Sequence, residues 1–249
     1  MPTGKTMRGF LSNNALKIIA ATLMVFDHIG MLLIPDSIFL RCIGRPAFPI
    51  FAYLVAEGAK YTKNFLRHFL TVAGFAAVIQ IGYYLFTHSL EMSVMFTFTL
   101  SLIIIFALDL FKSAVFTKTS SKAKIIFSAL FFLSTVILAA FLDLVLDIDY
   151  HFSGCIIPVL PSLLTTPKVD DPPEIFKKLD TKIYRIVAAS LGIMFLSLDF
   201  GGLQFFGFLA IPILMLYSEQ RGKLKMKYFF YIFYPLHLII LYGIVLLIK

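Results

Sequence analysis

Two ionisable residues stand side by side in a mainly apolar stretch, residues 15–30, which reads ALKIIAATLMVFDHIG. Asp27 and His28 are expensive to bury in hydrocarbon, so such groups usually face a protein interior or a water-filled cavity and serve a function there. Lys17 precedes His28 by eleven residues, which on an α-helix is three turns, or roughly 16 Å along the axis, on almost the same face. The pattern predicts a helix face that joins a cation near one membrane surface to a titratable base deeper in.

Histidine suits acid–base chemistry because its ordinary pKa lies near neutrality. Adjacent helical residues point about 100° apart, so we expect Asp27 to face a partner other than His28. Arg45, which opens the next apolar segment, is the natural candidate for an ion pair with Asp27. The alternative interpretation is that Asp27 and His28 form a structural pair, satisfied by neighbouring helices.

Glu57 follows Tyr53 by one helical turn and therefore shares its face. These two side chains are candidates for substrate binding. Glu57 could instead reach water at the membrane surface and pair with Lys60 or Lys63.

A second histidine lies in the last apolar segment, where the sequence Tyr234-Pro-Leu-His237 places it one turn after a tyrosine. His237 is either a site residue or a packed, hydrogen-bonded histidine. Gln80, Thr97, Thr99 and Ser101 are more typical of hydrogen bonds between membrane helices than of a site.

The composition indicates the class of protein. Hydrophobic residues make up 59% of the 249 residues and charged residues 14%, and the mean hydropathy is +0.90. Soluble domains are nearer half apolar and a quarter charged. We therefore expect residues 1–249 to form one all-α, multi-pass bundle in the cell membrane.

About nine membrane spans follow from the lengths of the apolar segments. The sixth is short and contains Pro158 and Pro161, which can break or tilt a helix. The expected spans are residues 14–34, 39–61, 64–86, 92–111, 123–146, 153–166, 183–198, 202–217 and 228–248.

The basic residues predict the orientation of these spans, because cytoplasmic loops are enriched in lysine and arginine. Of the 22 basic residues, 19 fall in the N-terminal tail, at its junction with the first span, or in alternate loops. The other side holds Arg41, Arg45 and Lys249. We predict a cytoplasmic N-terminus and an external C-terminus. The net charge of +8 is explained by this topology and gives no argument for nucleic-acid binding.

Cys42 and Cys155 both fall on the outer side in this topology. A disulfide between them is conceivable, but nothing in their spacing requires one, so two unpaired thiols are expected.

Five blocks of the sequence resemble the TraX family, in the family's order and over nearly the whole chain. The distinctive blocks contain DHIG, GRPAFPIFA and FYPLHL; the weaker ones are VMFTFTLSL, followed by Asp109, and DIDYHFSG. The family is named for N-terminal acetylation of conjugative pilin, so the resemblance implies a membrane-embedded acetyltransferase. The first span is distantly similar to membrane acyltransferases that modify envelope sugars, although Lys17 stands where that pattern commonly has arginine.

Acetyl-CoA, the donor that the resemblance implies, is cytoplasmic and carries several phosphate charges. Lys17, Lys60, Lys63 and Arg67 are on the predicted inner side and are candidate phosphate ligands. His28 would be the base that accepts a proton from the acceptor. No metal is expected.

The remaining candidates complete this hypothesis. Asp27 and Arg45 would hold the helices around the base, and His237 or Tyr234 could assist at the thioester oxygen. The acceptor would be a peptide amine or an envelope carbohydrate hydroxyl. A proton-coupled transporter is the alternative, since it would also carry intramembrane Asp, Glu and His. The sequence does not indicate the oligomeric state.

The charge asymmetry generates a prediction about topology. A reporter fused after Lys249 should be active only if it is a type that works outside the cytoplasm, because nine spans place the two ends on opposite sides. Cytoplasmic activity of the fusion would mean that the number of spans is even, with the short sixth segment as the first to reconsider.

Overall fold

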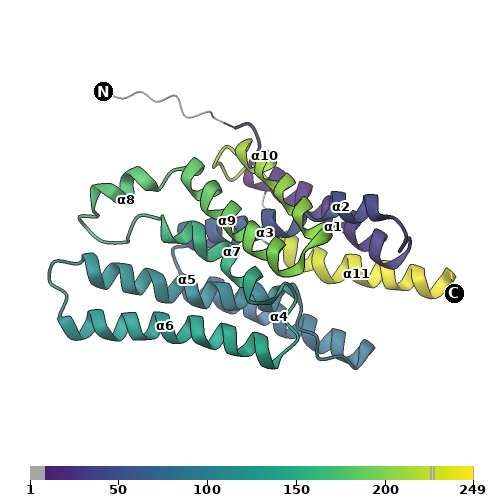
Figure 1. Cartoon of the computed structure of the whole chain (residues 1–249), viewed down its shortest axis with the longest axis horizontal. Coiled ribbons are helices and arrows are strands. Elements are labelled where there is room, and N and C mark those ends of the chain that lie inside the picture. Colours follow the sequence, from purple (N-terminus) through teal and green to yellow (C-terminus); the bar gives the residue numbers. More distant parts are fainter. Residues whose placement is uncertain (1–8, 225, 227, 249) are drawn as a thin grey trace. The chain divides into compact units, whose positions relative to one another are not determined.

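The structure, a computed structural model, describes residues 9–224, 226 and 228–248 (Figure 1). Helices account for 77% of the chain, which has no strands in the described part, apart from two isolated bridges, Leu11 with Tyr217 and Met92 with Ile148. The predicted all-α class is confirmed. The helices form two compact units, Met1–Phe51 with Ser197–Lys249, and Ala52–Leu196. The single domain over 1–249 stays a prediction.

The first unit contains the two ends of the chain. Its helices are α1 (Asn13–Leu32), α2 (Ile38–Gly44), the start of α3 (Ala47–Tyr61), the end of α9 (Lys182–Phe200), the 3-10 helix η1 (Gly202–Leu209), α10 (Ala210–Met215) and α11 (Phe229–Ile248). Helix α1 packs against both α2 and α11, and α2 also contacts η1. Helix α1 therefore packs against the helix that follows it in the sequence and against a helix from the other end of the chain.

Two glycines allow α1 and α2 to approach closely. A Cβ atom at Gly44 would lie 2.6 Å from the Cα of Asp27, and one at Gly30 would lie 2.9 Å from the Cβ of Leu40. Neither distance is possible between real atoms, so only glycine fits at these positions in the observed packing. This close contact brings the C-terminal end of α2 directly onto Asp27.

The beginning of α1 is held by a segment from the other end of the chain. The backbone N–H of Leu11 donates to the Leu216 carbonyl at 2.9 Å, and the N–H of Ser218 donates to the Leu11 carbonyl at 2.8 Å. The Asn14 side chain then donates to the Leu224 carbonyl at 2.8 Å. These contacts position the first turns of α1, on which Lys17 lies.

The second unit is built around α5 (Val94–Phe116). Its other helices are α4 (Phe65–Thr87), α6 (Lys122–Val145), α7 (His151–Leu163), α8 (Glu174–Leu179) and most of α3 and α9. Helix α5 packs against α4, α6 and α7, and the side-by-side course of α5 and α6 is visible in Figure 1.

Three of the four polar side chains that the sequence suggested for contacts between elements make such contacts in the second unit, whereas Thr99 Oγ1 donates to the Met95 carbonyl within α5 itself. Thr97 Oγ1 donates to the Asp149 carbonyl at 2.6 Å, and Ser101 Oγ donates to the Cys155 carbonyl at 2.9 Å. Gln80 Nε2 donates to the Glu91 carbonyl at 2.7 Å.

Each of the nine predicted spans is helical, but they differ in length. In the part of the chain that the structure describes, seven helical segments are long and apolar enough to cross a membrane; His151–Leu163 and Gly202–Met215 are shorter. Helix α7 is continuous although Pro158 and Pro161 lie inside it. The turn at Arg45 and Pro46 separates α2 from α3 within the second predicted span. The count of nine and the side of the N-terminus stay predictions.

Three features of the structure bear on the remaining sequence interpretations. Helix α8 was not predicted, because its six residues lie in a charged loop with little apolar periodicity. Cys42 and Cys155 are free thiols. The basic residues Lys5, Arg8, Lys225, Lys227 and Lys249, which contribute to the charge asymmetry, lie outside the described residues.

The close approach of α1 and α2 generates a stability prediction. Gly44→Ala should lower the free energy of unfolding by about 1–3 kcal/mol, because the added methyl group overlaps Asp27 and forces the helices apart. Thermal unfolding in detergent would measure the change. Gly82→Ala in α4 is the matched control: a Cβ there meets no atom within 4 Å, so the same substitution should leave stability unchanged or raise it slightly. Equal unfolding temperatures for the two variants would contradict the packing argument.

Candidate active site

The predicted ion pair between Asp27 and Arg45 is confirmed. Arg45 Nη2 lies 2.5 Å from Asp27 Oδ2 and 2.6 Å from Oδ1, and Arg45 Nε lies 3.1 Å from Oδ1. Asp27 is only 7% exposed. This fork-like contact of a guanidinium with both carboxylate oxygens is the strongest form of such a pair, and it joins α1 to the turn between α2 and α3.

Two further residues extend this pair into a buried polar cluster. Arg41 Nε lies 3.4 Å from Asp27 Oδ1, and Arg45 Nη1 donates to Gln204 Oε1 at 3.2 Å. One carboxylate thus faces two guanidinium groups, so these three ionised side chains carry an excess positive charge. Sequence reasoning missed Gln204, because a single glutamine in the segment GGLQFFGFL carries no spacing signal.

The two intramembrane histidines are brought together. His28 Nδ1 lies 2.9 Å from His237 Nε2, and His237 Nδ1 lies 3.0 Å from the Phe233 carbonyl. A carbonyl oxygen can only accept, so His237 Nδ1 carries a hydrogen, and in a neutral ring His237 Nε2 is then the acceptor. The hydrogen between the rings therefore belongs to His28 Nδ1. The basic atom of the pair is His28 Nε2.

Aromatic contacts hold His237 in place. Its ring stacks on Phe233 with centroids 4.9 Å apart and planes 5° apart, and Tyr234 meets it at 5.7 Å in a T-shaped arrangement. His237 is 5% exposed, whereas His28 is half-buried. His237 thus provides the orientation that Asp27 could not provide from the adjacent position.

Lys17 lies on the same helix as the base, near the segment that follows α10. Its Nζ lies 3.4 Å from the Met226 carbonyl and the side chain is half-buried. A lysine ammonium has three N–H donors, and this contact uses one of them. Its predicted role as a phosphate ligand stays a prediction.

In the second unit, Glu57 is paired with a residue that the sequence did not suggest. Its carboxylate accepts from Arg185 Nη1, and both side chains are 2% exposed. The alternative in which Glu57 reaches water at the membrane surface is therefore wrong, because the Glu57 side chain is buried within the unit. Tyr53, one turn earlier, is fully buried. Substrate binding by Tyr53 and Glu57 stays a prediction.

Lys60 also has an internal partner. Its Nζ lies 2.7 Å from Asp180 Oδ1, while the backbone N–H of Thr166 donates to Asp180 Oδ2 at 3.0 Å. Burial acts to raise the pKa of the Asp180 carboxyl, but the hydrogen bonds from Lys60 and Thr166, together with the positive charges of Lys60 and Arg185, leave that pKa below its ordinary value. As a candidate phosphate ligand, Lys60 would have to leave this carboxylate.

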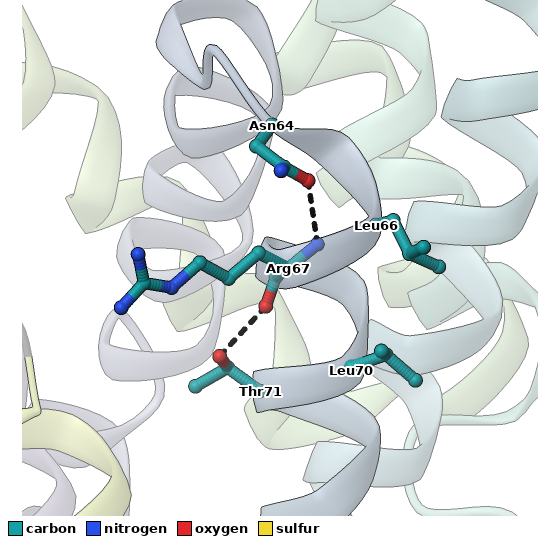
Figure 2. A pocket seen from close by; sticks show the side chains of 5 residues that line it. All are labelled: Asn64, Leu66, Arg67, Leu70 and Thr71. Atoms are coloured by element: carbon teal, nitrogen blue, oxygen red, sulfur yellow. Dashed lines mark hydrogen bonds between the residues drawn. The ribbon is translucent and has the colours of Figure 1, made fainter.

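Arg67 lies in the first turn of α4, where Figure 2 shows its side chain extending away from the helix. Asn64 Oδ1 accepts from the Arg67 N–H at 2.9 Å and so caps the helix. With Leu66, Leu70 and Thr71 these residues line an open pocket (Figure 2). Arg67 and the nearby Lys63 are exposed, and phosphate binding by either stays a prediction.

No group of three His, Cys, Asp or Glu side chains that could hold a metal ion occurs among the described residues. Among the described residues of the first unit, the histidine pair, the Asp27 cluster and Lys17 are the groups that the sequence had singled out for chemistry or that contact those groups.

The fold and this arrangement define a multi-pass helical membrane protein with a hydrogen-bonded histidine pair inside its first unit. The family comparison narrows this class. The family model described as TraX protein matches residues 12–245, and the chain belongs to the TraX family. Comparisons with curated proteins and with solved structures found no match.

The buried ion pair generates a prediction about coupling. Asp27→Asn or Arg45→Gln alone should cost about 3–5 kcal/mol of stability, because each leaves a buried charge without its main partner. The double variant should recover part of that loss. A double-mutant cycle on unfolding free energies measures the coupling, and strictly additive losses would show that the two charges do not depend on each other.

Proposed function

We propose that the protein is a membrane-embedded acetyltransferase, which moves an acetyl group from cytoplasmic acetyl-CoA to an amine or hydroxyl acceptor at or beyond the membrane. The observation that carries the proposal is the hydrogen-bond direction in the histidine pair, which leaves His28 Nε2 as an oriented base. Membership of the TraX family, which is associated with pilin acetylation, supports the same reaction.

In this reaction the acceptor nitrogen or oxygen attacks the carbonyl carbon of the thioester. As the new bond forms, the acceptor proton passes to His28 Nε2 and the carbonyl electron pair moves onto oxygen. The carbon–sulfur bond then breaks as the carbonyl re-forms, and the imidazolium returns the proton to the departing sulfur. His28 thus acts first as general base and then as general acid, a double role that histidine commonly has in acyl transfer.

His237 has a positioning role in this scheme. Its Nε2 holds the hydrogen of His28 Nδ1, so the opposite nitrogen of His28 stays unprotonated and in a constant direction. When His28 becomes an imidazolium, the same contact stabilises the charge, because the acceptor nitrogen of His237 faces the cationic N–H. Asp27 and Arg45 hold the part of α1 from which His28 projects.

The donor requires cations on the cytoplasmic side, because its phosphates are anionic. Lys17 precedes the base on the same helix by eleven residues, which corresponds to roughly 16 Å along the axis. That separation suits a long donor whose phosphates lie near the membrane surface while its thioester reaches the base. The acceptor is proposed by class: a peptide amine, as the family suggests, or a carbohydrate hydroxyl.

The base generates the central functional prediction. His28→Gln should fold and bind acetyl-CoA but lose about 10²–10⁴-fold in acetyl transfer, because glutamine keeps the size and hydrogen bonding of histidine without shuttling a proton. Transfer of radiolabelled acetyl groups by purified protein to an amine acceptor would measure this. His237→Gln should give a smaller loss, since the base remains but its tautomer is no longer set.

His88→Gln, at the exposed end of α4, is the control and should retain normal transfer. Thermal stabilisation of wild type and His28→Gln by acetyl-CoA, but not by acetate, would separate an acetyltransferase from an acetate carrier. Normal transfer by well-folded His28→Gln would show that the base lies elsewhere.

A further inference from the structure

Gln204 is a buried amide within the Asp27 cluster. Its side chain is 3% exposed, and its Oε1 accepts from Arg45 Nη1 at 3.2 Å. Its own backbone carbonyl accepts from Ser197 Oγ at 3.2 Å, which holds the start of η1 against the end of α9. Hydrogen bonds to both its backbone and its side chain therefore fix the position of Gln204.

The other atom of the amide has no such contact. Gln204 Nε2 is buried and has no hydrogen-bond partner among the residues that the structure describes. Rotating the amide by 180° would not help, because a guanidinium has donors only and requires the oxygen to face it. The N–H groups of Gln204 are thus held in a direction where an acceptor is missing, and a buried donor without an acceptor is costly.

The Gln204 amide belongs to the same hydrogen-bonded cluster as Asp27, the residue next to the proposed base. Arg45 connects Gln204 to Asp27, the residue that precedes His28 on α1. A cation hydrogen-bonded to an amide oxygen draws electron density from the amide, which makes its N–H groups stronger donors. Gln204 Nε2 is therefore suited to an acceptor that gains negative charge.

We propose that Gln204 Nε2 donates a hydrogen bond to the carbonyl oxygen of the acyl group during transfer. This inference rests on the proposed acetyltransferase function and adds the second element that acyl transfer needs. When the acceptor attacks, the carbonyl electron pair moves onto oxygen; Gln204 stabilises that oxyanion while the acceptor proton passes to His28 Nε2. Preorganised glutamine and asparagine side chains can provide such a donor.

Two substitutions separate this role from a structural one. Gln204→Glu keeps an oxygen for Arg45 but removes the N–H donor, and Gln204→Met removes both while remaining neutral and similar in size. Both should lower kcat by about 10²–10³-fold, with the KM for acetyl-CoA changed by less than about threefold. A residue that only supports Arg45 would tolerate glutamate, because the Arg45 contact would persist.

Gln80→Glu is the matched control. The Gln80 amide is bound on both sides, to the Glu91 carbonyl and to the Ser93 N–H, so this variant tests the effect of the same substitution away from the cluster. It should keep kcat within about threefold of wild type.

A spectroscopic measurement tests the contact itself. In wild type, the infrared carbonyl stretch of a ¹³C-labelled ketone analogue of acetyl-CoA should shift to lower frequency on binding, and Gln204→Glu and Gln204→Met should lose that shift. A normal kcat in either folded variant, or an unchanged carbonyl shift, would overturn this proposal and leave the His28 mechanism intact. Absence of acetyl transfer by wild type would remove both proposals.

Discussion

The ion pair between Asp27 and Arg45 is the contact on which the first unit depends. An unpaired carboxylate in an apolar bundle would be prohibitively costly, so α1 must present Asp27 to the turn that follows α2. Gly44 makes this possible, because its missing side chain leaves room for Asp27. With Arg45 held by Asp27, the direction of its other N–H groups is fixed. One of them, on Nη1, donates to Gln204 on η1, which therefore belongs to the same cluster. Two consecutive helices and the distant helix η1 are thereby positioned around one pair of charges.

The histidine pair uses a different principle. The direction of its hydrogen bonds is set by the Phe233 carbonyl, a backbone group that can only accept. His237 Nδ1 donates to this carbonyl, so His237 Nε2 accepts from His28 Nδ1. A carboxylate in place of His237 would stabilise the charged imidazolium of His28 more strongly, whereas a neutral imidazole costs less to bury. A neutral partner therefore orients the ring of His28 at a lower desolvation cost than a charged partner would. The stacking of His237 on Phe233 fixes the ring plane without adding charge.

The second unit shows that charge near a membrane does not by itself make a ligand site. Glu57, Arg185, Asp180 and Lys60 form a chain of opposite charges in which each member has a partner within the unit. Buried ion pairs of this kind favour one packing of the helices over others, because a different packing would leave a buried charge without a partner. Basic residues at the start of α4, such as Arg67, differ from this chain in that their side chains are exposed.

The sequence alone determined the class of protein and most of the helices, because apolar length and composition are properties of each segment by itself. It also indicated the pairing of Asp27 with Arg45, since these were opposite charges expected at a similar depth. Only the tertiary structure decided that His28 meets His237 across 209 residues, that Glu57 meets Arg185, and that Gln204 joins the cluster. The physical reason is that periodicity acts within one helix, whereas the partner of a buried polar group depends on which helices pack together and in what register. A lone histidine, glutamate or glutamine carries no local signal of that choice.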